Sequence, residues 1–106
     1  MAILDLYEET FDQVVVQSEK PFLVYFSAKW CGPCHAMKPI VEEISEELSE
    51  QLSIGKLDVD YAPSIAAGYG IRSIPAFVLF KNGEAASQFS GSCGKDRLKA
   101  LLEERL

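Results

Sequence analysis

Short uninterrupted apolar runs alternate with helical stripes along the chain. The runs Phe22–Phe26 and Ala76–Phe80 are rich in β-branched and aromatic residues, which is typical of strands buried on both faces. Between them, apolar side chains recur at intervals of three or four residues from Met37 to Leu52, with glutamates in the intervening positions. That spacing predicts an amphipathic helix. The pattern therefore predicts an α/β protein.

Shorter signals complete the expected order of elements. Asn82-Gly83 is typical of a two-residue hairpin turn, so residues 84–90 should return antiparallel to the preceding strand. The other expected elements are a weak strand at 3–7, a short helix after a capping box at Thr10 and Gln13, a strand at 54–59, a short helix within 60–70, and a C-terminal helix after Gly94. This order predicts a central mixed β-sheet of four to five strands, flanked by about four helices on both faces.

Length and composition limit the classes of protein that are possible. A chain of 106 residues has the size of one domain, which we expect to span residues 1–106. Its net charge of -6, without basic clusters, argues against binding to nucleic acid or to an anionic membrane. No apolar run reaches the roughly 18 residues that a membrane span needs, and the first residues do not resemble a signal peptide. We therefore expect a cytoplasmic protein.

Two of the three cysteines, Cys31 and Cys34, lie between a buried strand and the start of a helix. The first helical turn offers backbone N–H groups without partners and the positive end of the helix dipole, so a thiolate at Cys31 should be stabilised. Cys34 follows three residues later on the same helix face, where it can form a disulfide with Cys31. Pro33 suits the first turn because its missing N–H would have had no helical partner. The pair can therefore switch between dithiol and disulfide.

Several segments together identify a family. They are Trp30-Cys31-Gly32-Pro33-Cys34, Lys56-Leu57-Asp58-Val59-Asp60, Tyr69-Gly70-Ile71-Arg72-Ser73-Ile74-Pro75 and Phe80-Lys81-Asn82-Gly83. In this order and spacing, they resemble the thioredoxin family over essentially the whole chain. The resemblance implies a thioredoxin fold.

The resemblance also implies a protein disulfide reductase. Cys31 would be the exposed nucleophile that forms a mixed disulfide with a substrate protein, and Cys34 the buried thiol that resolves it. A thioredoxin reductase would then restore the dithiol. The resemblance implies no bound cofactor, no metal and a monomer, with disulfide-containing proteins as partners.

Substrate binding and site support are also implied by the matching motifs. A shallow groove beside the nucleophile would be lined by Trp30, Gly32, Pro33, Ile74, Pro75 and Gly91. The bond between Ile74 and Pro75 would be cis and would face the cysteines, which leaves the Ile74 backbone free to pair with substrate. Tyr25 and Lys56 would support the site.

Three positions depart from the family pattern. Tyr25 stands where an aspartate is usual, Ser27 where tryptophan is frequent, and Ala76 where threonine is common. The aspartate is assigned the proton handling at the resolving cysteine, together with the lysine that matches Lys56. A tyrosine, with an ordinary pKa near 10, is a poor base at neutral pH. We expect its hydroxyl to bond a water or Lys56, and Cys34 to lose its proton through solvent or Lys56.

The cysteines are also compatible with haem or zinc binding. Cys31 to His35 also fits the Cys-x-x-Cys-His pattern of haem attachment, with His35 and either Met1 or Met37 as axial ligands. A zinc site would need His35 and Cys93 to complete four ligands.

A thioredoxin fold could also act as a binding or scaffold subunit in which the redox pair is incidental. Cys93 has two interpretations as well. If Gly94 caps the last helix, Cys93 and Leu98 have the spacing of a hydrophobic staple; otherwise Cys93 is a regulatory thiol near Gly91.

Overall fold

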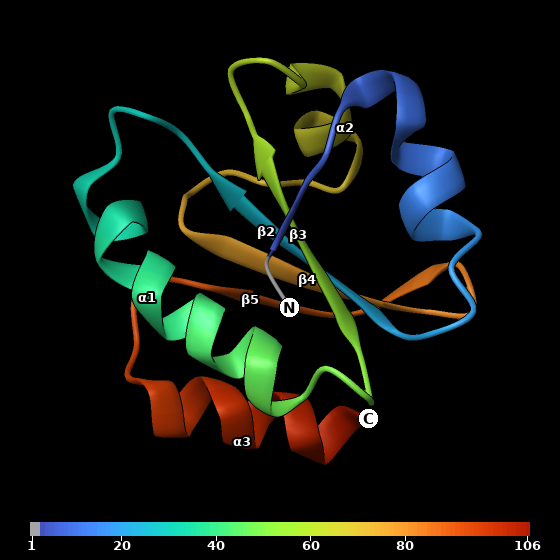
Figure 1. The fold of residues 1–106 in the computed structure, drawn as a ribbon. Coiled ribbons are helices and arrows are strands. Elements are labelled where there is room, and N and C mark those ends of the chain that lie inside the picture. The colour runs from blue at the N-terminus through green and yellow to red at the C-terminus, as the bar shows by residue number, and fades with distance from the viewer. Residues whose placement is uncertain (1–2) are drawn as a thin grey trace.

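The computed structural model describes residues 3–106, which form a five-stranded sheet in the order β1-β3-β2-β4-β5 (Figure 1). β3 pairs parallel with β1 and β2, and β4 pairs antiparallel with β2 and β5, so the sheet is mixed, as expected. The strands are β1 Leu4–Asp5, β2 Phe22–Ser27, β3 Ser53–Asp58, β4 Ala76–Lys81 and β5 Glu84–Ser90. The helices are η1 Glu8–Thr10, η2 Asp12–Val16, α1 Gly32–Glu47, α2 Pro63–Gly68 and α3 Lys95–Arg105.

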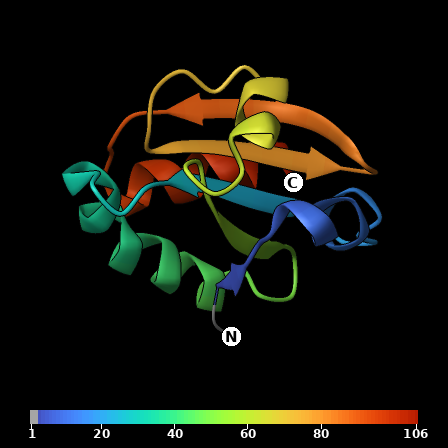
Figure 2. The same cartoon turned by 90° about the horizontal axis from the view of Figure 1, so that it is seen from above.

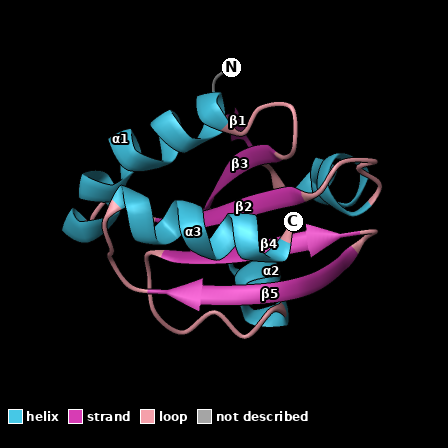
Figure 3. Cartoon of the chain, turned by 90° about the horizontal axis from the view of Figure 1, so that it is seen from below, coloured by secondary structure: helices cyan, strands magenta, loops and turns pink. Residues whose placement is uncertain are grey.

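Helices cover both faces of the sheet, which explains the continuous apolar runs of its central strands. In Figure 3, α1 and α3 lie in front of the sheet, whereas in Figure 2 α2 lies in front and α3 passes behind. Along β2, Leu23 and Tyr25 pack in the layer beneath α1 and α3. Val24 and Phe26 pack in the opposite layer, beneath α2 and the N-terminal helical segment. Alternate residues of one strand therefore contribute to two separate cores.

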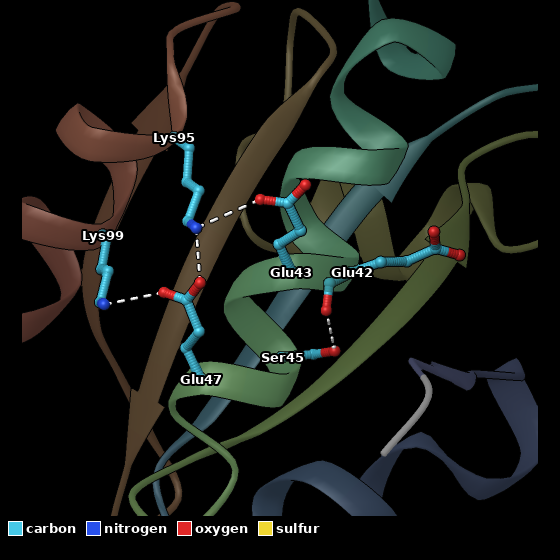
Figure 4. Close-up of polar contacts among 6 residues, drawn as sticks. All are labelled: Glu42, Glu43, Ser45, Glu47, Lys95 and Lys99. Carbon is cyan, nitrogen blue, oxygen red and sulfur yellow. Dashed lines mark hydrogen bonds and ion pairs between the residues drawn. The ribbon is translucent and has the colours of Figure 1, made fainter.

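Ion pairs join α1 to α3 at the surface (Figure 4). Lys95 Nζ lies 3.2 Å from Glu43 Oε1 and also contacts Glu47, and Lys99 Nζ lies 2.7 Å from Glu47 Oε1. Hydrogen bonds from Lys95 and Lys99 lower the pKa of the Glu47 carboxyl. Exposed ion pairs contribute little free energy individually. The apolar layer between these helices and the sheet therefore supplies most of the attachment.

The N-terminal helical segment does not begin as expected. Thr10 lies inside a helical stretch formed by η1 and η2, and no side chain caps either helix, so the predicted capping box is wrong. The segment is instead fixed by Phe11 and Val15, which are four residues apart and buried against the sheet. Burial of these side chains outweighs a local capping signal worth about 1 kcal/mol.

The long helix is shorter than its apolar stripe. α1 ends at Glu47, and the Leu48 N–H still donates to the Ile44 carbonyl. Leu52 belongs to the turn before β3, but its side chain remains buried in the layer under α1. The chain reverses here because β3 must pair parallel with β2 from Ser53 onward. The helical periodicity therefore continued into a loop that packs on the same core.

The hairpin between β4 and β5 forms as predicted. Asn82 and Gly83 have φ of 55° and 82°, the two positive values that a type I′ turn requires. β5 covers Glu84–Ser90, the predicted range, and is one of the two edge strands of the sheet.

Gly55 is a glycine in the sheet at which a side chain should be poorly tolerated. A Cβ atom built there would lie 2.7 Å from Leu6 Cγ, so Gly55→Ala must displace the buried Leu6 side chain. We expect the free energy of unfolding in urea to fall by about 1–3 kcal/mol. Gly68→Ala is the matched control, because nothing lies within 4 Å of a Cβ at the end of α2. Its stability should stay the same or rise by up to about 1 kcal/mol. Equal effects of the two substitutions would contradict this interpretation.

Candidate active site

Cys31 and Cys34 form a disulfide at the N-terminus of α1. Cys31 is the N-cap of the helix, and its Sγ accepts a hydrogen bond from the Cys34 N–H at 3.2 Å. The Cα atoms are 5.3 Å apart, within the usual range for a disulfide. Pro33 occupies the first turn, where no backbone hydrogen bond is lost. The N–H group aimed at Cys31 Sγ and the helix dipole both favour a negatively charged sulfur at this position.

The expected difference in exposure between the two cysteines is absent. Cys31 is 3% exposed and Cys34 is 2% exposed, so the prediction of an exposed Cys31 is wrong for this disulfide form. Both residues belong to the apolar layer beneath α1. Cys31 Sγ also lies 4.0 Å from the carbonyl oxygen of Ile74, which belongs to a distant part of the chain. Packing from outside the motif therefore covers the sulfur that the motif alone suggests is free.

The segment opposite the cysteines contains a cis peptide bond between Ile74 and Pro75, as expected. The Pro75 carbonyl accepts a hydrogen bond of 2.8 Å from the Gly91 N–H. Gly91 has a φ of 92°, a conformation that favours glycine. The structure thus brings Ile74, Pro75 and Gly91, which are far from the motif in sequence, to the end of the sheet where α1 begins.

Trp30 lies on the surface immediately before the cysteine pair. Its side chain is 69% exposed, and Nε1 donates a 2.8 Å hydrogen bond to Asp60 Oδ2. The Asp60 N–H in turn donates to Asp58 Oδ1 at 2.8 Å. The role of Asp60 was not found in the sequence, although it lies in a segment that carries the family resemblance. The tryptophan next to Cys31 in the sequence is therefore on the surface and is held by one hydrogen bond.

His35 connects α1 to the loop before it. Its Nε2 lies 2.6 Å from the Lys29 carbonyl oxygen. Because a carbonyl only accepts, Nε2 must carry the hydrogen in this contact. His35 is exposed on the first turn of α1, and no sequence pattern indicated this partner.

Tyr25 makes a different contact from the one expected. Its hydroxyl donates to the carbonyl oxygen of Cys34, and not to Lys56. The ring is 1% exposed and stacks on Phe77 of β4, with 5.2 Å between the ring centroids. Burial raises the pKa of Tyr25 to about 12, because the phenolate would lose its hydration. Tyr25 therefore remains a neutral hydrogen-bond donor throughout the neutral pH range.

A small cavity of about 80 Å³ lies beside Tyr25 and Cys34. Lys56 reaches it from β3, where it is the register partner of Tyr25, and Ser27 and Asp58 also line it. The cavity is large enough for water, and polar side chains form part of its walls. It brings Lys56 to the neighbourhood of Cys34, as the sequence suggested.

Cys93 fits the structural interpretation. Gly94 is the N-cap of α3, so Cys93 and Leu98 have the spacing of a hydrophobic staple, and both pack in the layer shared with α1. Its thiol is free and half-buried.

Within residues 3–106, no group of three or more His, Cys, Asp or Glu side chains is placed to hold a metal ion. Met37, the described candidate for an axial haem ligand, is buried in the same layer, and Met1 lies outside the described residues. No helix in the described part of the chain is long and apolar enough to cross a membrane.

Titration should reveal the buried hydroxyl of Tyr25. The difference between the ultraviolet tyrosinate titrations of the wild type and Tyr25→Phe should show one ionisation near pH 12, not near the ordinary value of 10.0. The raised pKa stabilises the native state fully below pH 10, and this contribution is lost as pH rises through 12. Two pKa units correspond to about 3 kcal/mol. Wild-type stability should therefore fall more steeply than that of Tyr25→Phe above pH 10; identical alkaline unfolding profiles would contradict this.

Comparisons with known proteins agree with the geometry of the site. The thioredoxin family model matches residues 2–104. Thioredoxin of Buchnera aphidicola subsp. Acyrthosiphon pisum is 41% identical over 104 residues, which are 98% of this chain and 96% of the relative. Thioredoxin 1 of Synechococcus elongatus is 41% identical over 99 residues, or 93% and 92% of the two chains. Thioredoxin Y1, chloroplastic, of Arabidopsis thaliana is 41% identical over 98 residues, and the chain spans only 57% of its length. This chain belongs to the thioredoxin family and is a thiol-disulfide oxidoreductase with a Cys-x-x-Cys redox pair.

Proposed function

We propose that the chain reduces disulfide bonds in other proteins, with Cys31 as nucleophile and Cys34 as the resolving thiol. The observation that carries this assignment is the position of Cys31 at the N-cap of α1, where its Sγ accepts the Cys34 N–H. In that position, the thiolate of Cys31 is more stable than the thiolate of Cys34. The thiolate is the form that attacks disulfides.

The reaction proceeds in two exchanges. The Cys31 thiolate attacks one sulfur of the substrate disulfide, forms a mixed disulfide, and releases the other substrate sulfur as a thiolate. The Cys34 thiolate then attacks Cys31 Sγ, which releases the second substrate thiolate and leaves the disulfide between Cys31 and Cys34. The substrate gains two electrons, and two protons from solvent complete its thiols. A thioredoxin reductase returns the electrons to the cysteine pair.

Substrate binds beside the cysteine pair in this proposal. Ile74, Pro75 and Gly91 form one wall, an assignment supported by the 4.0 Å separation of the Ile74 oxygen from Cys31 Sγ and by the hydrogen bond from Gly91 to Pro75. Trp30 forms the other wall, supported by its exposure and its bond to Asp60. Gly32 and Pro33, both exposed, lie between these walls. The Ile74 backbone would pair with the substrate chain.

The remaining features of the proposal follow from this chemistry. Residues 1–106 act as one domain and as a monomer, and the two sulfurs carry the electrons without a bound cofactor or metal. Lys56, at the cavity beside Cys34, supports proton transfer to and from the resolving thiol. The net charge of -6 disfavours nucleic acid and anionic membranes as partners. A cytoplasmic location stays a prediction, since some relatives are named as chloroplastic.

Insulin reduction tests the chemistry first and the electron donor second. The wild type should accelerate insulin reduction by dithiothreitol, and by NADPH with a thioredoxin reductase. Cys31→Ser should abolish this activity, whereas Cys34→Ser should accumulate a mixed disulfide, because the resolving thiol is missing. Cys93→Ser is the control that should retain activity. If the chain were a scaffold, Cys31→Ser would support the activity of its partner as well as the wild type does. That result would overturn the proposal.

Alkylation tests the assignment of roles. In the reduced protein at neutral pH, limiting iodoacetamide should modify Cys31 before Cys34, since only Cys31 Sγ occupies the N-cap. Each unit by which its pKa is lower corresponds to roughly tenfold more thiolate while both thiols are mostly protonated. Peptide mapping by mass spectrometry identifies the modified residue. Labelling of Cys34 first would reverse the assignment.

A further inference from the structure

The Tyr25 hydroxyl is a buried polar connection between the central strand β2 and the first turn of α1. It donates to the carbonyl oxygen of Cys34. The stacked contact with Phe77 fixes the plane of the ring, and both aromatic residues are buried. A helical carbonyl has two lone pairs, so it can accept this hydroxyl in addition to a helical N–H. The hydroxyl is thus held in place from two strands while it contacts the helix.

Cys34 is consequently restrained at both of its backbone polar groups. Its N–H points to Cys31 Sγ at 3.2 Å, and its carbonyl oxygen accepts from Tyr25. Because peptide units are planar, the direction of the Cys34 carbonyl relative to the Cys34 N–H depends only on the φ and ψ of Cys34. Holding the carbonyl in place therefore limits how far the N–H can turn away from the sulfur.

We propose that Tyr25 is a positioning residue for the thiol chemistry, whose hydroxyl fixes the Cys34 carbonyl and thereby keeps the Cys34 N–H directed at Cys31 Sγ. The inference rests on the proposed role of Cys31 as nucleophile. Tyr25 acts through the backbone of Cys34 and exchanges no proton. Loss of the hydroxyl weakens the hydrogen bond that stabilises the Cys31 thiolate.

A neutral donor makes this connection independent of pH in the working range. The raised pKa of Tyr25 keeps the hydroxyl protonated wherever thiols titrate. The charged or titratable groups that line the adjacent cavity are Lys56 and Asp58 from β3, His35 and Lys38 from α1, and Lys29 from the loop before α1. These groups are unchanged in a Tyr25→Phe variant. A shift in the Cys31 titration would therefore report the lost hydroxyl.

The test uses Tyr25→Phe, which removes the hydroxyl and keeps the aromatic ring. The rate of Cys31 alkylation in the reduced protein is measured from pH 5 to 9, alongside thiolate absorbance at 240 nm. We expect the apparent pKa of Cys31 to rise, so that the alkylation rate on the acidic limb falls roughly threefold to tenfold, the effect of one weakened hydrogen bond. The plateau rate at high pH should not change.

Phe26→Leu is the matched control. Phe26 belongs to the same strand, but its side chain packs in the opposite core and has no hydroxyl. It should lower the melting temperature at least as much as Tyr25→Phe and leave the Cys31 titration unchanged. An equal shift in both variants would show general loosening of the strand and overturn the inference, as would an unchanged titration in Tyr25→Phe.

The outcome is separable from that of the proposed function. Alkylation needs no substrate protein, so the Cys31 titration can be measured whether or not insulin is reduced. If the wild type reduces insulin normally and the Cys31 titration is unchanged in Tyr25→Phe, only the positioning role is wrong. Absence of insulin reduction by the wild type removes the proposed function, whatever the titration shows.

Discussion

The packing of α1 against the central strands is the interaction on which the rest of the site depends. Met37, Val41 and Ile44 bury one side of the helix against β2 and β4. Met37 is only three residues after Cys34, and Cys34 is buried in the same layer, so this packing also fixes the position of the first turn. That turn contains Cys34 and the N–H directed at Cys31 Sγ. The redox pair is therefore placed by an apolar contact that contains no reactive group.

The polar contacts around the pair adjust a geometry that the core has already set. His35 attaches the first turn to the preceding loop, Trp30 is held by Asp60, and Gly91 holds Pro75 on the opposite side. Each is a single hydrogen bond, with a net contribution of about 1 kcal/mol. Together they determine which backbone and side-chain atoms face the disulfide. The ion pairs between α1 and α3 lie at the far end of the helix, where solvent screens them.

Tyr25 shows how the core of this chain accommodates a polar group. A carboxylate at this buried position would have to be desolvated, which costs several kcal/mol unless it is paired. A phenol costs less, and its single donor is satisfied by the Cys34 carbonyl. Tyrosine in place of a carboxylate removes a base from beside the resolving thiol. The groups available to that thiol are then Lys56 and Asp58, which line the cavity, and solvent.

The sequence by itself determined the elements and the chemistry of the motif. The apolar runs, the stripe of α1 and the Asn82-Gly83 turn are local patterns, because periodicity and backbone preference are properties of neighbouring residues. The Cys31–Cys34 pair at a helix start is local for the same reason. The family resemblance supplied the cis bond at Pro75, which composition would not have indicated.

Only the tertiary structure decided the contacts between distant segments. Local signals failed at Thr10, where burial of Phe11 and Val15 determined the helix, and at Leu52, where the chain turned to enter β3. The burial of Cys31, the bond of Trp30 to Asp60 and the partner of the Tyr25 hydroxyl each depend on residues brought together by the sheet. The residue type determines which hydrogen bonds a side chain can donate or accept, but the packing of separate elements determines its partner.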